Sequence, residues 1–201
     1  DDNCAFGDDA LSLNTTGASN VAVGDKALQY ATTAANNTSV GKSSMAATTT
    51  GDSCVAVGKD SMLNNTTGRF NCALGYESLA LNTTGANNTA LGKAALYANT
   101  TAADNTAAGF AALISNTTGA NNAAFGSGAL ANNTTAANNT AVGRQALLAN
   151  TTGSQNTAIG KKSGEVNTTG AGNTFVGSDA GGTTTTGDSI TCIGKDARAS
   201  A

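Results

Sequence analysis

The chain has 201 residues, of which 39% are hydrophobic but only 4% aromatic and 11% charged; its net charge is −3, and it has no Pro, Trp or His. So few large apolar side chains exclude a conventional globular core, while the apolar content excludes a highly charged disordered segment. The slightly acidic balance predicts no nucleic acid partner, and no apolar run approaches the roughly 20 residues of a membrane span, so we expect no membrane insertion.

A short repeat accounts for the whole sequence without insertion or deletion. Its clearest mark is a glycine that follows an apolar residue in every copy and returns at every seventeenth position. These marked glycines are Gly7, Gly24, Gly41, Gly58, Gly75, Gly92, Gly109, Gly126, Gly143, Gly160, Gly177 and Gly194. The unit is too short for a helical hairpin, which needs more than about 30 residues, and the recurring Gly, Thr-Thr and Asn-Asn disfavour one long helix. We therefore expect twelve stacked coils that form a single domain over residues 1–201.

The first element of each unit is a short strand that ends at the marked glycine, as in Asn-Thr-Ala-Val-Gly at residues 139–143. Its β-branched residues stand at alternate positions, and the glycine suits a turn. Asn opens ten of the twelve units, with Cys54 and Ile190 in the other two. We expect the apolar residue before the glycine to face the core. These residues are Phe6, Val23, Val40, Val57, Leu74, Leu91, Ala108, Phe125, Val142, Ile159, Val176 and Ile193.

The second element follows the glycine and carries a Leu or Met preceded by Ala or Ser, which we interpret as a second short strand. The large residues are Leu11, Leu28, Met45, Met62, Leu79, Leu96, Leu113, Leu130 and Leu147. In the last units Gly164, Gly181 and Arg198 stand at this place, so we expect the core to thin there. Coils that pair at about 4.8 Å would stack these residues into a continuous core. The predicted fold is all-β: a parallel β-solenoid, or β-roll, of twelve 17-residue coils and roughly 53–58 Å long.

Asn-Thr-Thr supplies the second turn of the unit and is also an N-glycosylation sequon. The candidate sites are Asn14, Asn65, Asn82, Asn99, Asn116, Asn133, Asn150 and Asn167, with further sequons at Asn36, Asn37, Asn64, Asn87, Asn132 and Asn138. The alternative is a ladder of stacked Asn and Thr side chains at a coil corner. Thr-Thr persists where Ala31, Thr48 and Thr184 replace the Asn, which favours the ladder as the primary cause. Glycans on individual sites are compatible with it.

Ice binding is a third interpretation of the Thr-Thr pairs. Adjacent residues of a strand point to opposite faces, so each pair would present one outward rank of Thr. A flat ice-binding array needs two ranks on one face, which disfavours this interpretation.

The cysteines suggest candidate disulfides or junction contacts. Cys54 and Cys72 are separated by one repeat plus one residue and would lie on neighbouring coils, close enough to bond unless they face opposite sides. Cys4 and Cys192 lie on the first and last coils, too far apart to bond within one straight rod, so they are candidates for a contact between molecules stacked end to end. The alternative is that both are buried thiols with no such role. Four cysteines also fit an extracytosolic compartment.

Nothing in the sequence indicates an enzyme. There is no His, no recurring acid pair and no nucleophile beside a base, so we expect no catalytic site, cofactor or metal. The residue after the marked glycine is often basic, as at Lys42 and Lys93, but Asp8 and Asp25 share this column. A solvated edge of mixed charge explains it.

The units NTALGKAAL at 88–96 and NTAVGRQAL at 139–147 resemble a known group of repeats. They are similar to the YadA-like head repeats of trimeric autotransporter adhesins and to repeats of tail-fibre-like bacterial and phage surface proteins. The shared residues are the Asn, small residue, aliphatic residue and Gly of each N-x-A-[VLI]-G. The resemblance implies a left-handed parallel β-roll, an extracellular or cell-surface location and, often, trimers. The present unit is longer than the usual head repeat.

The function expected from these patterns is structural: a building block of an extracellular fibre or filament in which copies of the chain stack end to end. The alternative is a homotrimeric adhesin or tail-fibre segment that binds a surface receptor. The face with the opening Asn and its small partner distinguishes the two, since three chains would bury it in a trimer, whereas it would meet solvent or sugar in a filament. The small partners are Ala73, Ala90, Ala107, Ala124, Ala141 and Ala158.

Overall fold

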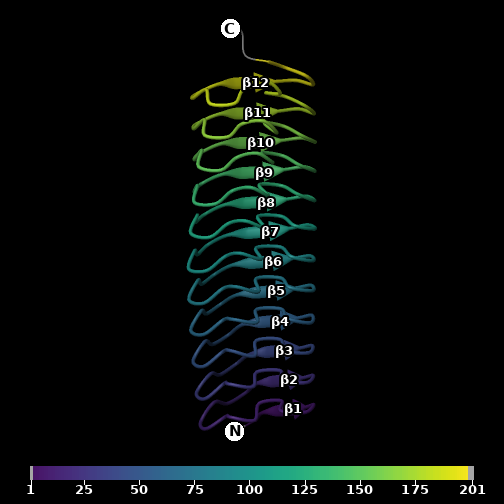
Figure 1. The fold of residues 1–201 in the computed structure, drawn as a ribbon, viewed down its shortest axis with the longest axis vertical. Helices are drawn as coiled ribbons and strands as arrows, with labels where there is room; N and C mark the ends of the chain where they lie inside the picture. Colours follow the sequence, from purple (N-terminus) through teal and green to yellow (C-terminus); the bar gives the residue numbers. More distant parts are fainter. Residues whose placement is uncertain (1, 199–201) are drawn as a thin grey trace.

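The computed structural model describes residues 2–198 as a straight β-solenoid with one strand in each repeat (Figure 1). The strands of this part of the chain are β1 (Cys4–Phe6), β2 (Val21–Val23), β3 (Thr38–Val40), β4 (Val55–Val57), β5 (Cys72–Leu74), β6 (Thr89–Leu91), β7 (Thr106–Ala108), β8 (Ala123–Phe125), β9 (Thr140–Val142), β10 (Thr157–Ile159), β11 (Thr174–Val176) and β12 (Thr191–Ile193). They form one sheet in chain order, and every pair is parallel. The predicted all-β parallel solenoid is confirmed.

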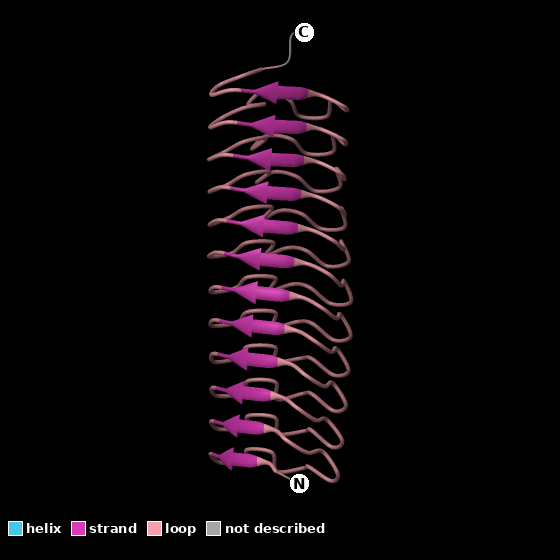
Figure 2. Ribbon diagram, turned by 180° about the vertical axis from the view of Figure 1, so that it is seen from behind, coloured by secondary structure: helices cyan, strands magenta, loops and turns pink. Residues whose placement is uncertain are grey.

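The register of the sheet is the repeat itself. Thr89 of β6 pairs with Thr106 of β7, and Leu91 pairs with Ala108, so each residue lies beside its equivalent in the next unit. Figure 2 shows the strands as parallel arrows on one side of the rod, with turns completing each coil. Every side chain of an internal coil therefore lies between the equivalent residues of the coils above and below.

The marked glycine is required at the end of each strand for two reasons. Its φ lies between 119° and 143° along the column, a region that L residues rarely adopt. A Cβ on Gly109 would also lie 2.6 Å from the carbonyl group of Gly126 in the next coil. This close backbone approach between coils thus occurs where no side chain exists.

The segment after the glycine is a series of turns, so the expected second strand is wrong. Its Leu and Met residues have φ of 50–55°, in the left-handed region. The Leu113 N–H donates to the Ala129 carbonyl of the next coil at 3.0 Å, so these residues still bond along the axis. Val, Ile and Thr are absent from the positive-φ residues of the described chain, because branching at Cβ makes this backbone especially unfavourable. This explains why the core column holds Leu and Met, which are not branched at Cβ.

The apolar residue before the marked glycine faces outward, which corrects its expected place in the core. Side chains alternate along a strand, and the middle residue of each strand points inward, as the fully buried Ala90 does in β6. The flanking residues therefore lie outside: Leu74 is 50% exposed and Phe125 44%. The core instead packs the small middle residues against the Leu and Met column. It also contains buried Asn side chains along the length of the rod.

At Gly164 and Gly181 the core does not thin as expected, whereas at Arg198 it does, because this side chain is exposed. Phe175 replaces the inward Ala in β11 and is fully buried. A Cβ on Gly164 would lie 2.5 Å from Phe175 Cδ2, and one on Gly181 would meet the other edge of the same ring. One phenyl ring therefore fills the space that two leucines occupy in the regular coils.

Exchange of Phe175 tests this compensation. Phe175→Ala should destabilise the rod by about 3–5 kcal/mol, since it empties a site whose neighbours have no side chains. The triple variant Phe175→Ala, Gly164→Leu, Gly181→Leu restores the regular pattern and should recover most of that loss in urea unfolding. A triple variant no more stable than Phe175→Ala would contradict the compensation.

Leu113 tests the backbone requirement of the core column. Leu113→Met should be nearly neutral, because Met45 and Met62 occupy the same column. Leu113→Ile has nearly the same volume but should lose roughly 1–2 kcal/mol more, because Ile is β-branched and φ here is 51°. Thermal unfolding monitored by circular dichroism measures both; equal midpoints would show that φ does not select the residue.

Candidate functional site

The asparagines of Asn-Thr-Thr form a ladder inside the rod, which we call the corner ladder. Asn82 Nδ2 donates to Asn65 Oδ1 of the preceding coil at 2.9 Å and to the Gly85 carbonyl at 3.0 Å. The same pair of bonds recurs in each coil up to Asn167. The fully buried members are Asn65, Asn82, Asn99, Asn116, Asn133, Asn150 and Asn167. Both donors of each amide are used from Asn82 onward, so each coil holds the next through its side chain.

The burial of the corner ladder bears on glycosylation. A glycan on one of these seven amides would replace a bonded N–H and leave the sugar without a path to solvent. Asn14 is half-buried and donates to the Gly17 carbonyl at 3.0 Å. Sugar on these eight residues stays a prediction, and the geometry argues against it at the seven buried ones. Among the further sequons, Asn37 is buried and Asn64 half-buried, whereas those on the surface are Asn36, Asn87, Asn132 and Asn138.

The opening asparagines form a second internal ladder, the opening ladder. The Asn37 N–H donates to Asn20 Oδ1 at 3.1 Å, and Asn37 Nδ2 donates to the Gly51 carbonyl at 2.9 Å. Asn37 and its small partner column are buried, so the face expected to distinguish a trimer from a filament is part of the core. It is open neither to another chain nor to solvent, and any contact between copies must use another surface.

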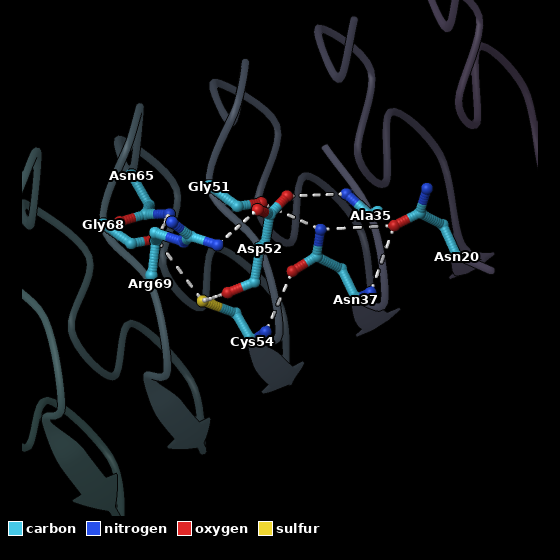
Figure 3. Close-up of polar contacts among 9 residues, drawn as sticks. All are labelled: Asn20, Ala35, Asn37, Gly51, Asp52, Cys54, Asn65, Gly68 and Arg69. Carbon is cyan, nitrogen blue, oxygen red and sulfur yellow. Dashed lines mark hydrogen bonds and ion pairs between the residues drawn. The ribbon is translucent and has the colours of Figure 1, made fainter. Parts of the chain in front are cut away.

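Cys54 takes the place of an asparagine in the opening ladder (Figure 3). Its N–H donates to Asn37 Oδ1 at 2.9 Å, its thiol donates to the Gly68 carbonyl at 3.4 Å, and its sulfur accepts the Asn71 N–H at 3.5 Å. The thiol thus reproduces, more weakly, both the donor and the acceptor of an amide. Burial raises the pKa of Cys54 to about 11, so the thiol keeps the proton that it donates at neutral pH.

All four cysteines are free in the structure. The candidate disulfide between Cys54 and Cys72 is not formed: Cys54 is buried in the opening ladder, whereas Cys72 begins β5 and is half-exposed on the outside. Cys4 is exposed at the start of β1, whereas Cys192 is the buried middle residue of β12. Inward and outward positions alternate in a strand, so stacked rods would not bring Cys4 and Cys192 to the same side. Their junction contact stays a prediction that this geometry disfavours.

The two residues of each Thr-Thr pair have different environments. The first Thr donates along the axis, as Thr100 Oγ1 does to the Thr117 carbonyl at 3.2 Å, and this recurs from Thr15 to Thr168. The second Thr is exposed in each of the eleven units that contain the pair. Each corner therefore presents a single outward rank of Thr.

The column after the marked glycine is an exposed edge of mixed charge. Lys42 Nζ lies 2.9 Å from Asp25 Oδ2, and this hydrogen bond lowers the pKa of the Asp25 carboxyl. Further along, Lys93 Nζ lies 5.6 Å from the ring centroid of Tyr76 and 6.0 Å from that of Phe110. Such exposed pairs contribute little stability, so this edge acts mainly in solvation.

The outer face of the sheet is an uncharged surface along the rod, with one column of apolar residues and one column that is mainly Thr. We define the outer face as the first and third residues of β1–β12. Charged residues are absent from these positions, although the chain has 10 basic and 13 acidic residues. Sequence reasoning missed this face because it assigned the larger apolar column to the core. A small residue between two larger ones, as in Thr-Ala-Val, was the signal for a strand whose middle faces a narrow interior.

The comparisons with known proteins give no family. No family model matches the chain, and neither a curated protein nor a solved structure matches it. Within residues 2–198 the structure has no group of three or more His, Cys, Asp or Glu side chains that could hold a metal ion. The same residues include no helix with the length and apolar character needed to cross a membrane.

Asn116 tests the corner ladder. Asn116→Ala removes both bonds donated by Nδ2, leaves Asn99 Oδ1 without its donor and removes the acceptor of Asn133 Nδ2. The free energy of unfolding should fall by about 2–4 kcal/mol. Asn132→Ala, at an exposed sequon in the next coil, is the matched control and should change it by less than about 0.5 kcal/mol.

Thr184 tests the same ladder in the opposite direction. Asn167 Oδ1 is buried without a partner because the next coil has Thr184 where the ladder needs Asn. Thr184→Asn should supply the donor and stabilise the rod by roughly 1 kcal/mol in urea unfolding. A loss of stability in this variant would show that the ladder does not act through its amides.

Proposed function

We propose that this chain is a structural rod, a building block of an extracellular fibre. The observation that carries the proposal is that axial hydrogen bonds join neighbouring coils at several places around each turn. The sheet, the corner ladder, the opening ladder and the first Thr of each pair all bond along the same direction. Bending or stretching the rod would break bonds at several sides at once.

The geometry of the repeat also fits a fibre component, because length depends only on the number of units. Each 17-residue coil adds one strand at about 4.8 Å, and no coil depends on a distant part of the chain. A chain with more units would be a longer rod of the same cross-section. The similarity to adhesin head and tail-fibre repeats supports an extracellular or cell-surface location.

A second candidate function is a segment of a multi-chain adhesin or tail fibre, in which several rods lie side by side. The apolar outer face favours it, since such a surface suits contact with another chain better than contact with water. Receptor binding would then belong to the assembled fibre.

Duplication of internal units tests the rod function. Insertion of a second copy of residues 88–138 after residue 138 adds three coils and should lengthen the particle by about 14 Å in small-angle X-ray scattering, with an unchanged cross-section. An insert of the same composition in scrambled order is the control and should add no ordered length. An intact duplicate that grows in cross-section instead would contradict the proposal.

End-to-end assembly is tested separately by electron microscopy of the concentrated protein. Stacking through the coil ends should give filaments whose lengths exceed that of a single chain. Rods that stay at single-chain length would contradict end-to-end stacking and leave the rod itself intact.

A further inference from the structure

We propose that the outer face of the sheet is the surface through which copies of this chain associate side by side. The proposal rests on the structural function above and names the surface and the partner. The opening Asn face, which sequence reasoning expected to decide this question, is buried and cannot serve.

The first argument is composition. The third residue of each strand is apolar in all twelve units, and the first is Thr or apolar. The first residues are Cys4, Val21, Thr38, Val55, Cys72, Thr89, Thr106, Ala123, Thr140, Thr157, Thr174 and Thr191. Two residues from each of twelve strands give 24 positions, and none is charged. The centres of protein interfaces are depleted of charge in the same way.

The second argument is exposure. Leu74, Phe125 and Ile159 stand 50%, 44% and 43% exposed, although they are larger than the Ala residues buried beneath the sheet. They lie in one line along the rod because the strands are in register. A continuous row of apolar residues of this length is typical of an interaction site.

The third argument is the presence of ion pairs on both sides of the outer face. On one side of the outer face Arg69 Nη2 lies 2.9 Å from Asp52 Oδ2, in the turn that precedes the strands. On the other side Lys59 Nζ lies 2.9 Å from Asp60 Oδ2, directly after the marked glycine. A centre without charge, with charged groups at its margins, is the usual anatomy of a protein interface.

The fourth argument concerns size and partner. Stable interfaces use roughly 20–30 residues on each side, and the outer face offers 24. Its side chains repeat at about 4.8 Å along a straight line, and a second copy of this chain has the same spacing over the same length. Two such faces can pack along their whole length at about 10 Å, as the inner faces of sheet sandwiches do.

Sedimentation equilibrium over a wide dilution series tests the proposal. The wild-type chain should have an average mass that is a multiple of 19.5 kDa at high concentration and falls on dilution. The variant Leu91→Thr, Val142→Thr, Ile159→Thr keeps β-forming residues on the face but makes it polar, so its association should weaken at least about tenfold. Circular dichroism should show the fold unchanged.

The matched control places polar residues on apolar side chains outside the sheet. Leu13→Thr with Tyr30→Thr changes residues that are 48% and 49% exposed, and should leave association unchanged. A wild-type chain that stays monomeric throughout, or a folded face variant that associates as before, would overturn the proposal. Either result leaves the duplication test of the rod unaffected, so a failed interface and a failed rod are distinguishable.

Discussion

The structure depends on one constraint: each coil must be hydrogen-bonded by a copy of itself. A buried polar side chain in so narrow a core bonds to its own column in the neighbouring coil and to nearby backbone carbonyls, as Asn82 does to Asn65 and Gly85. Asn meets this condition over any number of stacked coils, because its amide both donates and accepts hydrogen bonds. Where Ala31 and Thr184 follow an Asn of the corner ladder, the preceding Oδ1 atoms of Asn14 and Asn167 have no partner. Cys54 keeps the opening ladder continuous because its thiol can also donate and accept.

The same constraint couples the packing of neighbouring coils. The left-handed backbone of the turn segment selects Leu and Met for the core column, and the register then stacks them. Because coils lie so close, one residue can replace side chains in its own coil and in the preceding one, as Phe175 does for the missing leucines at Gly181 and Gly164. The unit of packing is therefore a column of side chains and not a single repeat.

The solenoid could be predicted from the sequence because a gapless repeat of so short a period, with Gly, Asn and Thr-Thr in fixed places, has few physical explanations. The structural role of the corner asparagines was also predictable, because Thr-Thr persists in the units that lack the Asn. The inward and outward sides of the strand were not predicted. In so short a strand, only the relative sizes of the middle and flanking side chains indicate which of them face the core. The replacement of two leucines by Phe175 was also missed. Phe175, Gly164 and Gly181 are spread over two units, and only the distances between them reveal the replacement.

In the proposed function the rod carries contact surfaces along its length, and the uncharged outer face is the surface on which we expect copies to meet. The axial rise per repeat is the most direct measure of the register on which all of this depends. Diffraction from crystals or oriented rods should show a strong axial spacing of about 4.8 Å, with one repeat unit for each step. An axial spacing of about 5.4 Å, as in a helix, or a rise that does not match one unit would contradict the stacked register.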